Sequence, residues 1–381
     1  MIDFILTHEN EDVNTLLLKH KSIYGYPASF VATQIKGRKR VKEKLPTWYS
    51  NPALLYPPQQ NLEQTSSEVT AQFKSEIMWE EKPGKTIVDL TGGFGVDAFY
   101  FSKKFETVWY VEPDKQLKEI ATANHDKMAV HNIRHKECTA LEFLNTTQSS
   151  DWIYLDPSRK DNGKKVFQLS DCEPKVVPLL PLLFKHSDTI LIKASPLLDL
   201  KQGITQLPQT QKIFVVSVGN ECKEILFLLK KDFSGEPEII CVNLPSKQRF
   251  SFFFTEEDQA QVNFENPQQY IYEPHSSILK AGAFKTIAAK SGVSKIGKNT
   301  HLYTHAAKLE NFEGRIFKNL GELEDRKVQL PEGKANIISR NYPLTPDQIK
   351  KKYKLKDGGE KYLLAFSGIR KKYLIVAERL T

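Results

Sequence analysis

The feature that most restricts the possible folds of this chain is a glycine-rich loop from Val88 to Asp97. It lies between a pattern typical of an apolar strand and one typical of a helix. Because glycine lacks a Cβ, Gly92, Gly93 and Gly95 let the backbone approach a ligand closely. In open α/β sheets such a loop follows the carboxyl end of a strand, where ligands bind. The segment therefore predicts a doubly wound sheet with a ligand site at the start of a helix.

The region around this loop repeats the same alternation. From residue 85 to residue 244, short β-branched runs alternate with helical patterns, which predicts βαβ units and a mainly parallel sheet. The expected strands are 86–90, 107–112, 133–137, 152–156, 188–193 and 213–218. The run 224–229 follows after the turn at Gly219-Asn220, so we expect these last two strands to form an antiparallel hairpin at the sheet edge. A parallel sheet that ends in an antiparallel hairpin is typical of the methyltransferase variant of the doubly wound, Rossmann-like α/β fold, and we expect this arrangement here.

Two further regions flank this α/β segment, and we expect three domains: 1–80, 81–245 and 246–381. The first is a helical cap, in which Thr65 and Glu68 form a capping box for the helix that leads into the core. The third, an α+β domain of the ferredoxin-like class, begins where the pattern changes to an aromatic run and then a polar linker. We expect there a helix over 276–291, a lysine-rich helix near 346–354, and strands at 313–318, 335–339, 362–366 and 373–377.

Composition narrows the function classes. No apolar run approaches the roughly 18 residues of a membrane span, and the N-terminus lacks the pattern of a signal peptide. The four cysteines, Cys138, Cys172, Cys222 and Cys241, show no zinc spacing. We therefore expect a cytoplasmic protein with no membrane partner, no disulfide and no metal. The net charge is +8, and residues 331–381 hold twelve Lys/Arg against five Asp/Glu.

An acidic residue ends the second expected strand, where it can accept hydrogen bonds from both ribose hydroxyls of a nucleoside. This residue, Glu112, lies 23 positions after Asp89. NAD would use the same acid, but the glycines do not match G-x-G-x-x-G, and Asp89 and Asp97 would lie unfavourably near a pyrophosphate. Their charge suits the cationic sulfonium and ammonium of S-adenosylmethionine. The simplest alternative is a tight turn without a ligand.

The fourth expected strand also stops at an acid, Asp156, followed by Pro157-Ser158-Arg159-Lys160. In a doubly wound sheet this strand lies beside the first, so Asp156 faces the donor and could accept a hydrogen bond from an attacking amine. An exposed carboxylate at a strand end is the alternative. The nearby cations, Arg159, Lys160, Lys164 and Lys165, suit a phosphate backbone or a solvated surface.

Three other features are weaker candidates. Lys193-Ala194-Ser195-Pro196 ends the fifth strand, either as an acceptor contact or as a turn. Cys222 would be the nucleophile of a covalent pyrimidine methylation, although a cysteine in a hairpin is usually a small buried residue. His125, His131 and His135 lie on or near one helix, and a surface face fits their spacing better than a metal site.

These motifs together resemble the bacterial class I methyltransferases that carry a THUMP-like domain at the C-terminus. The resemblance covers nearly the whole chain and rests on four blocks: residues 63–71, 89–97 and 154–160, and Tyr272-Glu273-Pro274-His275 with Lys280-Ala281-Gly282. The loop is also similar to that of ribosomal RNA guanine-N2 methyltransferases. This implies donor contacts from six residues, Asp89, Thr91, Gly93, Gly95, Asp97 and Glu112.

From the position of the fourth strand we expect the acceptor site at Asp156, Pro157, Ser158 and Arg159. Amino-methyltransferases of nucleic acid usually show Asn/Asp-Pro-Pro and an aromatic, whereas this chain lacks the ring that would stack on a flipped base. A base amine is nevertheless the leading acceptor.

THUMP domains resemble RNA-capture modules, which implies an RNA partner. The basic C-terminal segment fits this use through Arg340, Lys350, Lys351, Lys352, Lys354, Lys371 and Lys372, with Tyr342 and Tyr353 as stacking rings. The alternatives are methylation of a protein or small molecule, and an inactive RNA-binding protein.

Overall fold

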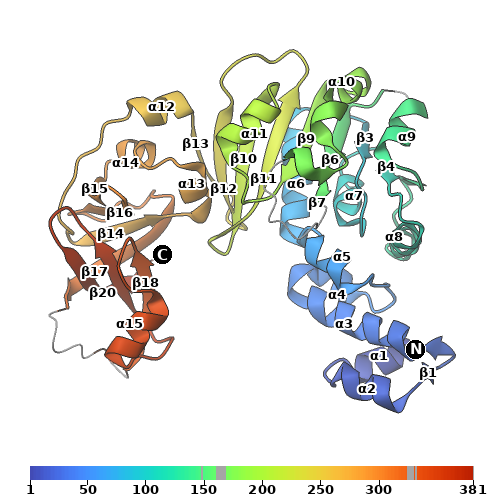
Figure 1. The fold of residues 1–381 in the computed structure, drawn as a ribbon, viewed down its shortest axis with the longest axis horizontal. Coiled ribbons are helices and arrows are strands. Elements are labelled where there is room, and N and C mark those ends of the chain that lie inside the picture. The colour runs from blue at the N-terminus through green and yellow to red at the C-terminus, as the bar shows by residue number, and fades with distance from the viewer. Residues whose placement is uncertain (147–148, 160–168, 324–329, 331–332, 381) are drawn as a thin grey trace. The chain divides into compact units, whose positions relative to one another are not determined.

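The computed structural model describes residues 1–146, 149–159, 169–323, 330 and 333–380 (Figure 1). The chain divides into two compact units. The first comprises Met1–Gln211 and Ile225–Gly235, and the second comprises Lys212–Glu224 and Glu236–Thr381. In the sequence, the segment Ile225–Gly235 of the first unit therefore lies between the two segments of the second unit. The three-domain division expected from the sequence stays a prediction.

Helices dominate the first eighty residues, as the sequence predicted. They are α1 Ile2–Thr7, α2 Val13–Lys19, α3 Ala28–Lys44, α4 Pro46–Ser50, α5 Gln59–Gln64 and α6 Glu68–Glu81. A two-stranded sheet, β1 Ser22–Ile23 and β2 Tyr26–Pro27, precedes α3. Apolar residues spaced along one face of α3 pack against α1 and α2 in a small core. This core includes Leu16, Val31 and Ile35.

Helix α6 begins differently from the expectation. Its N-cap is Ser67, whose Oγ accepts a hydrogen bond from the backbone N–H of Thr70 at 3.4 Å. Thr65 is instead the C-cap of α5, and the Glu68 carboxylate accepts a hydrogen bond from the Thr47 backbone N–H at 2.9 Å. The predicted capping box between Thr65 and Glu68 is therefore wrong, because the preceding helix already uses Thr65.

The first unit contains a mainly parallel sheet whose strand order is β11-β9-β6-β3-β4-β5. The strands are β3 Thr86–Asp89, β4 Thr107–Val111, β5 Ile133–Lys136, β6 Trp152–Leu155, β9 Thr189–Ala194 and β11 Glu221–Lys230. Strand β11 is antiparallel to β9, and the other pairs are parallel. This is the α/β fold predicted from the alternating pattern.

Helices connect these strands. They are α7 Val96–Phe101, α8 Lys115–Lys127, α9 Ala140–Thr146, α10 Val176–His186 and α11 Leu200–Gln206. The first strand, β3, lies between β4 and β6, with Asp89 opposite Tyr110 on one side and Tyr154 on the other. The strand order therefore places the carboxyl ends of β4, β3 and β6 side by side, at the position where such sheets bind ligands.

The second unit holds most of β10 and two further strands, β12 and β13. Their bounds are β10 Thr210–Val218, β12 Glu238–Leu244 and β13 Gln248–Phe252. The left-handed residues Gly219 and Asn220 follow β10 and form the predicted tight turn. The prediction of a sheet edge at β10 is wrong, because β12 pairs with it in parallel and β13 pairs with β12. Of the aromatic run, Phe250 and Phe252 lie in β13, Phe253 is the N-cap of α12, and Phe254 begins that helix.

The rest of the second unit is an α+β domain around a seven-stranded sheet of order β15-β16-β14-β17-β20-β19-β18. Its strands are β14 Tyr270–Pro274, β15 Ser294–Gly297, β16 Thr300–His305, β17 Gly314–Glu322, β18 Asn336–Arg340, β19 Lys361–Ser367 and β20 Lys372–Arg379. Its helices are α12 Phe254–Gln259, α13 Ser276–Ala281, α14 Thr286–Ser291 and α15 Pro346–Tyr353. The four strands and the lysine-rich helix predicted for this region are confirmed.

One predicted helix of this domain is two helices in the structure. The sequence predicted a helix over 276–291, but Gly282 adopts a left-handed φ of 81° and ends α13. Gly292, with φ 69°, ends α14 as expected. Both glycines act as helix C-caps, for which a residue without Cβ is favoured.

Candidate functional site

The glycine-rich loop is shaped by two side chains packed beneath it. A Cβ on Gly92 would lie 2.3 Å from the Tyr110 ring, and a Cβ on Gly95 would lie 2.7 Å from the His125 ring. Gly93 and Gly95 also have positive φ angles, 54° and 84°. The Tyr110 hydroxyl donates a hydrogen bond to the Gly93 carbonyl. Steric contact and backbone conformation together explain why glycines occupy this loop.

Asp89 ends β3 beneath this loop and is 1% exposed. Its Oδ1 accepts a hydrogen bond from the Thr91 backbone N–H at 3.0 Å. Its Oδ2 is buried and has no hydrogen-bond partner among the residues that the structure describes. Burial, and then the charge of Asp97, raise the pKa of Asp89 well above its ordinary value. A cationic or hydrogen-bond-donating ligand would satisfy this oxygen.

Glu112 follows β4 and contacts the same loop. One carboxylate oxygen accepts a hydrogen bond from the Gly93 backbone N–H at 2.9 Å, and the other accepts one from the Asp114 N–H at 2.9 Å. Burial raises its pKa. Since each carboxylate oxygen can accept two hydrogen bonds, both retain capacity for a further donor. The predicted neighbours Gly93 and Glu112 are therefore brought together.

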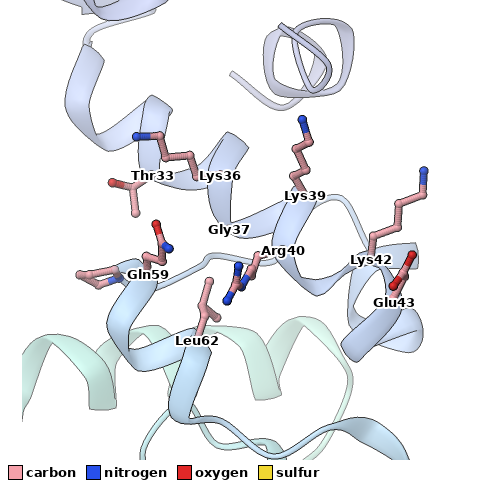
Figure 2. Close-up of a pocket in the computed structure, with 10 residues that line it drawn as sticks. Thr33, Lys36, Gly37, Lys39, Arg40, Lys42, Glu43, Gln59 and Leu62 are labelled. Carbon is pink, nitrogen blue, oxygen red and sulfur yellow. The ribbon is translucent and has the colours of Figure 1, made fainter. Parts of the chain in front are cut away.

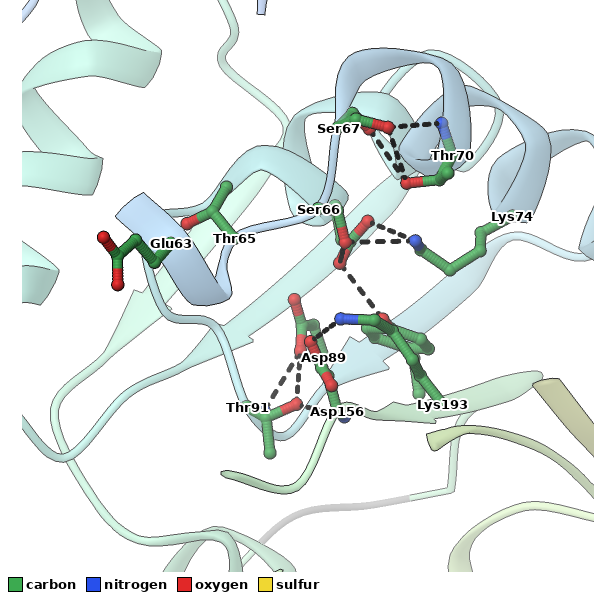
Figure 3. A network of polar contacts seen from close by, with 12 residues as sticks. Glu63, Thr65, Ser66, Ser67, Thr70, Lys74, Asp89, Thr91, Asp156 and Lys193 are labelled. Carbon is green, nitrogen blue, oxygen red and sulfur yellow. Dashed lines mark hydrogen bonds and ion pairs between the residues drawn. The ribbon is translucent and has the colours of Figure 1, made fainter. Parts of the chain in front are cut away.

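Asp97, in the first turn of α7, lies in a buried polar network with Ser66 and Lys74. Figure 3 shows the side chains of Ser66 and Lys74, which are joined by a hydrogen bond. Asp97 Oδ2 accepts hydrogen bonds from Ser66 Oγ at 2.8 Å and from the Tyr154 hydroxyl at 3.0 Å. The Lys74 ammonium, which is fully buried, lies 3.2 Å from Asp97 Oδ1 and donates to Ser66 Oγ at 3.1 Å. The carboxylate thus has a cation and two hydroxyls from the protein itself. Its predicted contact with a donor stays a prediction.

We did not predict this network, because Lys74, Ser66 and Tyr154 come from three separate parts of the chain. The available signal was the position of Lys74 on α6. It lies beside Phe73, one residue before Ser75 and three before Ile77, and all of these are buried. A lysine within the apolar stripe of a helix requires a buried anion as a partner.

Asp156 directly follows β6, as predicted, and contacts the loop that follows β3 (Figure 3). Its backbone N–H donates to Thr91 Oγ1 at 2.6 Å. Its Oδ2 forms an ion pair with the Lys193 ammonium from β9, and the two side chains are 29% and 14% exposed. Lys193, a weaker candidate in the sequence, therefore joins the site.

The residues after Asp156 leave this cluster. Pro157 is buried, and Ser158 is exposed, with its Oγ donating to the Glu173 carbonyl at 3.3 Å. The short strand β7, Ser158–Arg159, pairs antiparallel with β8, Cys172–Glu173. A 3-10 turn, Leu169–Asp171, directly precedes β8. Lys160, Lys164 and Lys165 lie outside the described residues.

Of two weaker candidates, His125 differs from the expectation and Cys222 agrees with it. His125 is fully buried rather than on a surface face, because it packs under Gly95 and bonds the Gly95 carbonyl (2.9 Å) and His135 (2.8 Å). Burial lowers its pKa to about 3, so the ring is neutral. Burial also raises the pKa of Cys222 to about 12, which disfavours the thiolate that covalent methylation requires.

Within residues 1–146, 149–159, 169–323, 330 and 333–380, no group of three His, Cys, Asp or Glu side chains is arranged to hold a metal ion. Within that same part of the chain, every helix is too short or too polar to cross a bilayer.

Comparisons with known proteins agree with this architecture. Residues 270–312 match the model of a ferredoxin-like domain, and residues 319–379 match a model described as THUMP domain-like. A crystal structure from Porphyromonas gingivalis W83, described as a "putative methyltransferase", is 31% identical with a TM-score of 0.87. The match covers 100% of this chain and 97% of that one. No curated protein matches the chain.

Two more distant solved structures resemble less than half of this chain. One is a "putative methyltransferase" from Streptococcus mutans in complex with SAH. It is 11% identical, the match covers 43% of this chain and 96% of that one, and the TM-score is 0.32. The other, precorrin-6y C5,15-methyltransferase from Geobacter metallireducens GS-15, is 12% identical over 45% and 90%, with a TM-score of 0.34. Likeness at this level carries no argument about this chain.

The sheet, with its glycine-rich loop after the first strand, is that of a class I methyltransferase. The chain belongs to the family of the Porphyromonas gingivalis protein, the bacterial class I methyltransferases with a THUMP-like domain at the C-terminus.

Proposed function

We propose that the chain is an S-adenosylmethionine-dependent methyltransferase that acts on RNA. The observation that carries the proposal is the position of three carboxylates, Glu112, Asp89 and Asp156, at the carboxyl ends of the neighbouring strands β4, β3 and β6. This edge of a doubly wound sheet is where ligands bind.

The charges and hydrogen-bonding capacity of these residues fit the methyl donor. Asp89 Oδ2 is buried without a partner among the described atoms, so a nearby cation would stabilise it. Glu112 retains capacity for the two ribose hydroxyls. When bound, S-adenosylmethionine supplies an activated methyl group. The pyrophosphate of NAD, the alternative left open by the sequence, would meet the same carboxylates unfavourably.

Asp156 is the residue that we assign to the acceptor. Thr91 fixes its backbone and Lys193 orients its carboxylate, so both groups hold it against the donor loop. A carboxylate here accepts a hydrogen bond from an amine and aligns the nitrogen, and alignment is the main contribution of a protein to such a displacement. The match to a THUMP-like domain supports RNA as the substrate, with a base amine as the leading acceptor.

Calorimetric titration of S-adenosylmethionine and NAD into the full chain tests the donor site. We expect micromolar binding of S-adenosylmethionine that is lost in Asp89→Ala and in Glu112→Ala. The matched control is Glu106→Ala, because Glu106 is an exposed acid at the opposite end of β4. Binding of NAD instead, or of neither ligand, would refute the donor assignment.

Transfer of a labelled methyl group tests the acceptor. We expect label in RNA from total cellular extract, sensitive to ribonuclease and absent with Asp156→Asn, although this variant still binds the donor. Label that resists ribonuclease and yields to protease would show a protein substrate. Turnover unchanged by Asp156→Asn would remove this residue from the acceptor site.

A further inference from the structure

The N-terminal helical segment carries a concentration of positive charge on helix α3. Six of the nine residues from 36 to 44 are Lys or Arg, with Glu43 as the single acid. Helices α3 and α5 border a hollow of about 760 Å³ at this place (Figure 2). We call it the basic hollow, and its main lining residues are Lys36, Gly37, Lys39, Arg40, Lys42 and Leu62.

The floor of the basic hollow is fixed by close packing. A Cβ on Gly37 would lie 2.4 Å from Tyr56 Cβ, so the helix approaches this segment as closely as a glycine permits. The Gln34 side chain donates to the Tyr56 carbonyl at 3.0 Å and accepts from the Tyr56 N–H at 2.8 Å. Leu62 is 2% exposed. The hollow is therefore preformed and does not depend on surface side chains alone.

The cations of α3 fall into two groups. Arg38 and Lys44 serve the fold: Arg38 donates to Glu9 at 3.0 Å, and Lys44 donates to the Leu62 carbonyl at 2.8 Å. Lys36 and Lys39, in contrast, are exposed and have no ionic or hydrogen-bonding partner among the residues described by the structure. This second group leaves positive charge at the hollow.

Two further cations contribute. Arg40 forms an exposed ion pair with Glu63 at 3.2 Å, which has little energetic value in water and can exchange for another anion. Lys42 is exposed and lies 5.7 Å from the centre of the Tyr49 ring. In Figure 2, Arg40 lies beside Leu62, whereas Lys39 and Lys42 extend away from α5.

We propose that the basic hollow binds the phosphate backbone of the RNA substrate, an inference that rests on the proposed function. Positions 36, 39 and 40 share one face of α3, and together they present three cations within about one helical turn. Lysines bind phosphates as point charges and arginines bind them with several donors. Because these contacts would be to phosphate, they position the RNA and do not read its sequence.

Fluorescence anisotropy with the full chain and a labelled single-stranded RNA of mixed sequence, titrated at several salt concentrations without donor, tests the proposal. The variant is Lys36→Gln/Lys39→Gln. Each phosphate contact contributes about 0.7 to the slope of log K against log salt for single strands. We expect the slope to fall by about 1.4, which corresponds to about 25-fold weaker binding at 0.1 M salt.

The matched control is Lys104→Gln/Lys185→Gln, which removes the same charge from exposed lysines elsewhere in the first unit. We expect its affinity and slope to stay near those of the wild type. If both double variants weaken binding equally, the effect is one of net charge and the proposal fails. If Lys36→Gln/Lys39→Gln binds like the wild type, the basic hollow is not an RNA site, and an acidic protein becomes the partner class.

The same titration separates this proposal from the proposed function. If the wild type does not bind RNA, both the basic hollow as an RNA site and the RNA acceptor are refuted. If RNA binds with the expected dependence on Lys36 and Lys39 but receives no methyl group, the basic hollow is supported as an RNA site and the proposed methylation of RNA is refuted. Donor titration into the double variant should match the wild type, which confirms that the first unit is folded.

Discussion

The two units bury carboxylates in different ways. In the second unit, Glu273 on β14 is fully buried, and both of its oxygens are bound by the guanidinium groups of Arg315 and Arg340. In the first unit, Asp97 has Lys74 and two hydroxyls, whereas Asp89 keeps one buried oxygen without a partner among the described residues. A carboxylate with every oxygen satisfied supports the fold. One with an orphaned oxygen is suited to a ligand.

The origin of the partner also differs between the units. Glu273 and Arg315 face each other in the register of β14 and β17, so strand pairing itself brings them together. Lys74 comes from α6, outside the sheet, and reaches Asp97 only when this helix packs against α7. The ion pair of the first unit therefore depends on helix docking, and we expect it to be the more sensitive of the two.

Removal of Lys74 should have the largest effect. Lys74→Met leaves Asp97 buried without a cation, and we expect the free energy of unfolding to fall by about 3–5 kcal/mol. Urea unfolding followed by tryptophan fluorescence measures this, because all four tryptophans belong to the first unit: Trp48, Trp79, Trp109 and Trp152. The double variant Lys74→Met/Asp97→Asn should recover most of the loss. A double variant as unstable as the single would show that the charge of Asp97 is not the cause.

Removal of Glu273 should cost less. Glu273→Ala releases Arg315 and Arg340, whose side chains are 18% and 39% exposed and can gain water in exchange. We expect a loss of about 1.5–3 kcal/mol in the second unit. Hydrogen exchange of peptides from β14 and β17 measures it, and the tryptophan transition of the first unit serves as the internal control. A loss equal to that of Lys74→Met would refute the contrast between the units.

Asp89→Asn should have the smallest effect, and in the opposite direction. The raised pKa of Asp89 means that the folded protein holds a proton that the unfolded chain loses above about pH 3.9. Wild-type stability should therefore fall as the pH rises from this value through the folded pKa, and then stay level. Asn does not ionise and keeps an oxygen for Thr91.

Urea unfolding of wild type and Asp89→Asn between pH 3 and pH 8 measures this difference. We expect the variant to gain about 1 kcal/mol over the wild type at neutral pH and nothing at pH 3. Its affinity for S-adenosylmethionine should fall at the same time. A variant less stable than the wild type at neutral pH would show that Asp89 supports the fold, as Glu273 does.

The sequence by itself determined the sheet and the position of three site residues. Asp89, Glu112 and Asp156 each follow an apolar run that becomes β3, β4 or β6, and the place of an acid at a strand end is a local property. The glycines of the loop were likewise recognisable from local conformational freedom. Two helix boundaries were not predicted. The start of α6 at Ser67 depends on the preceding helix, which uses Thr65 as its C-cap, and the break between α13 and α14 depends on the left-handed conformation of Gly282.

Only the tertiary structure decided the partners of these residues. Lys74 pairs with the buried Asp97, and Lys193 pairs with Asp156. His125 packs under Gly95. The two exposed lysines of the basic hollow, unlike Arg38, form no ion pair among the described residues. The physical reason is that a periodic pattern reports the environment of one segment. An ion pair or a steric contact between segments depends on how closely two elements pack, and this distance is set by the whole core.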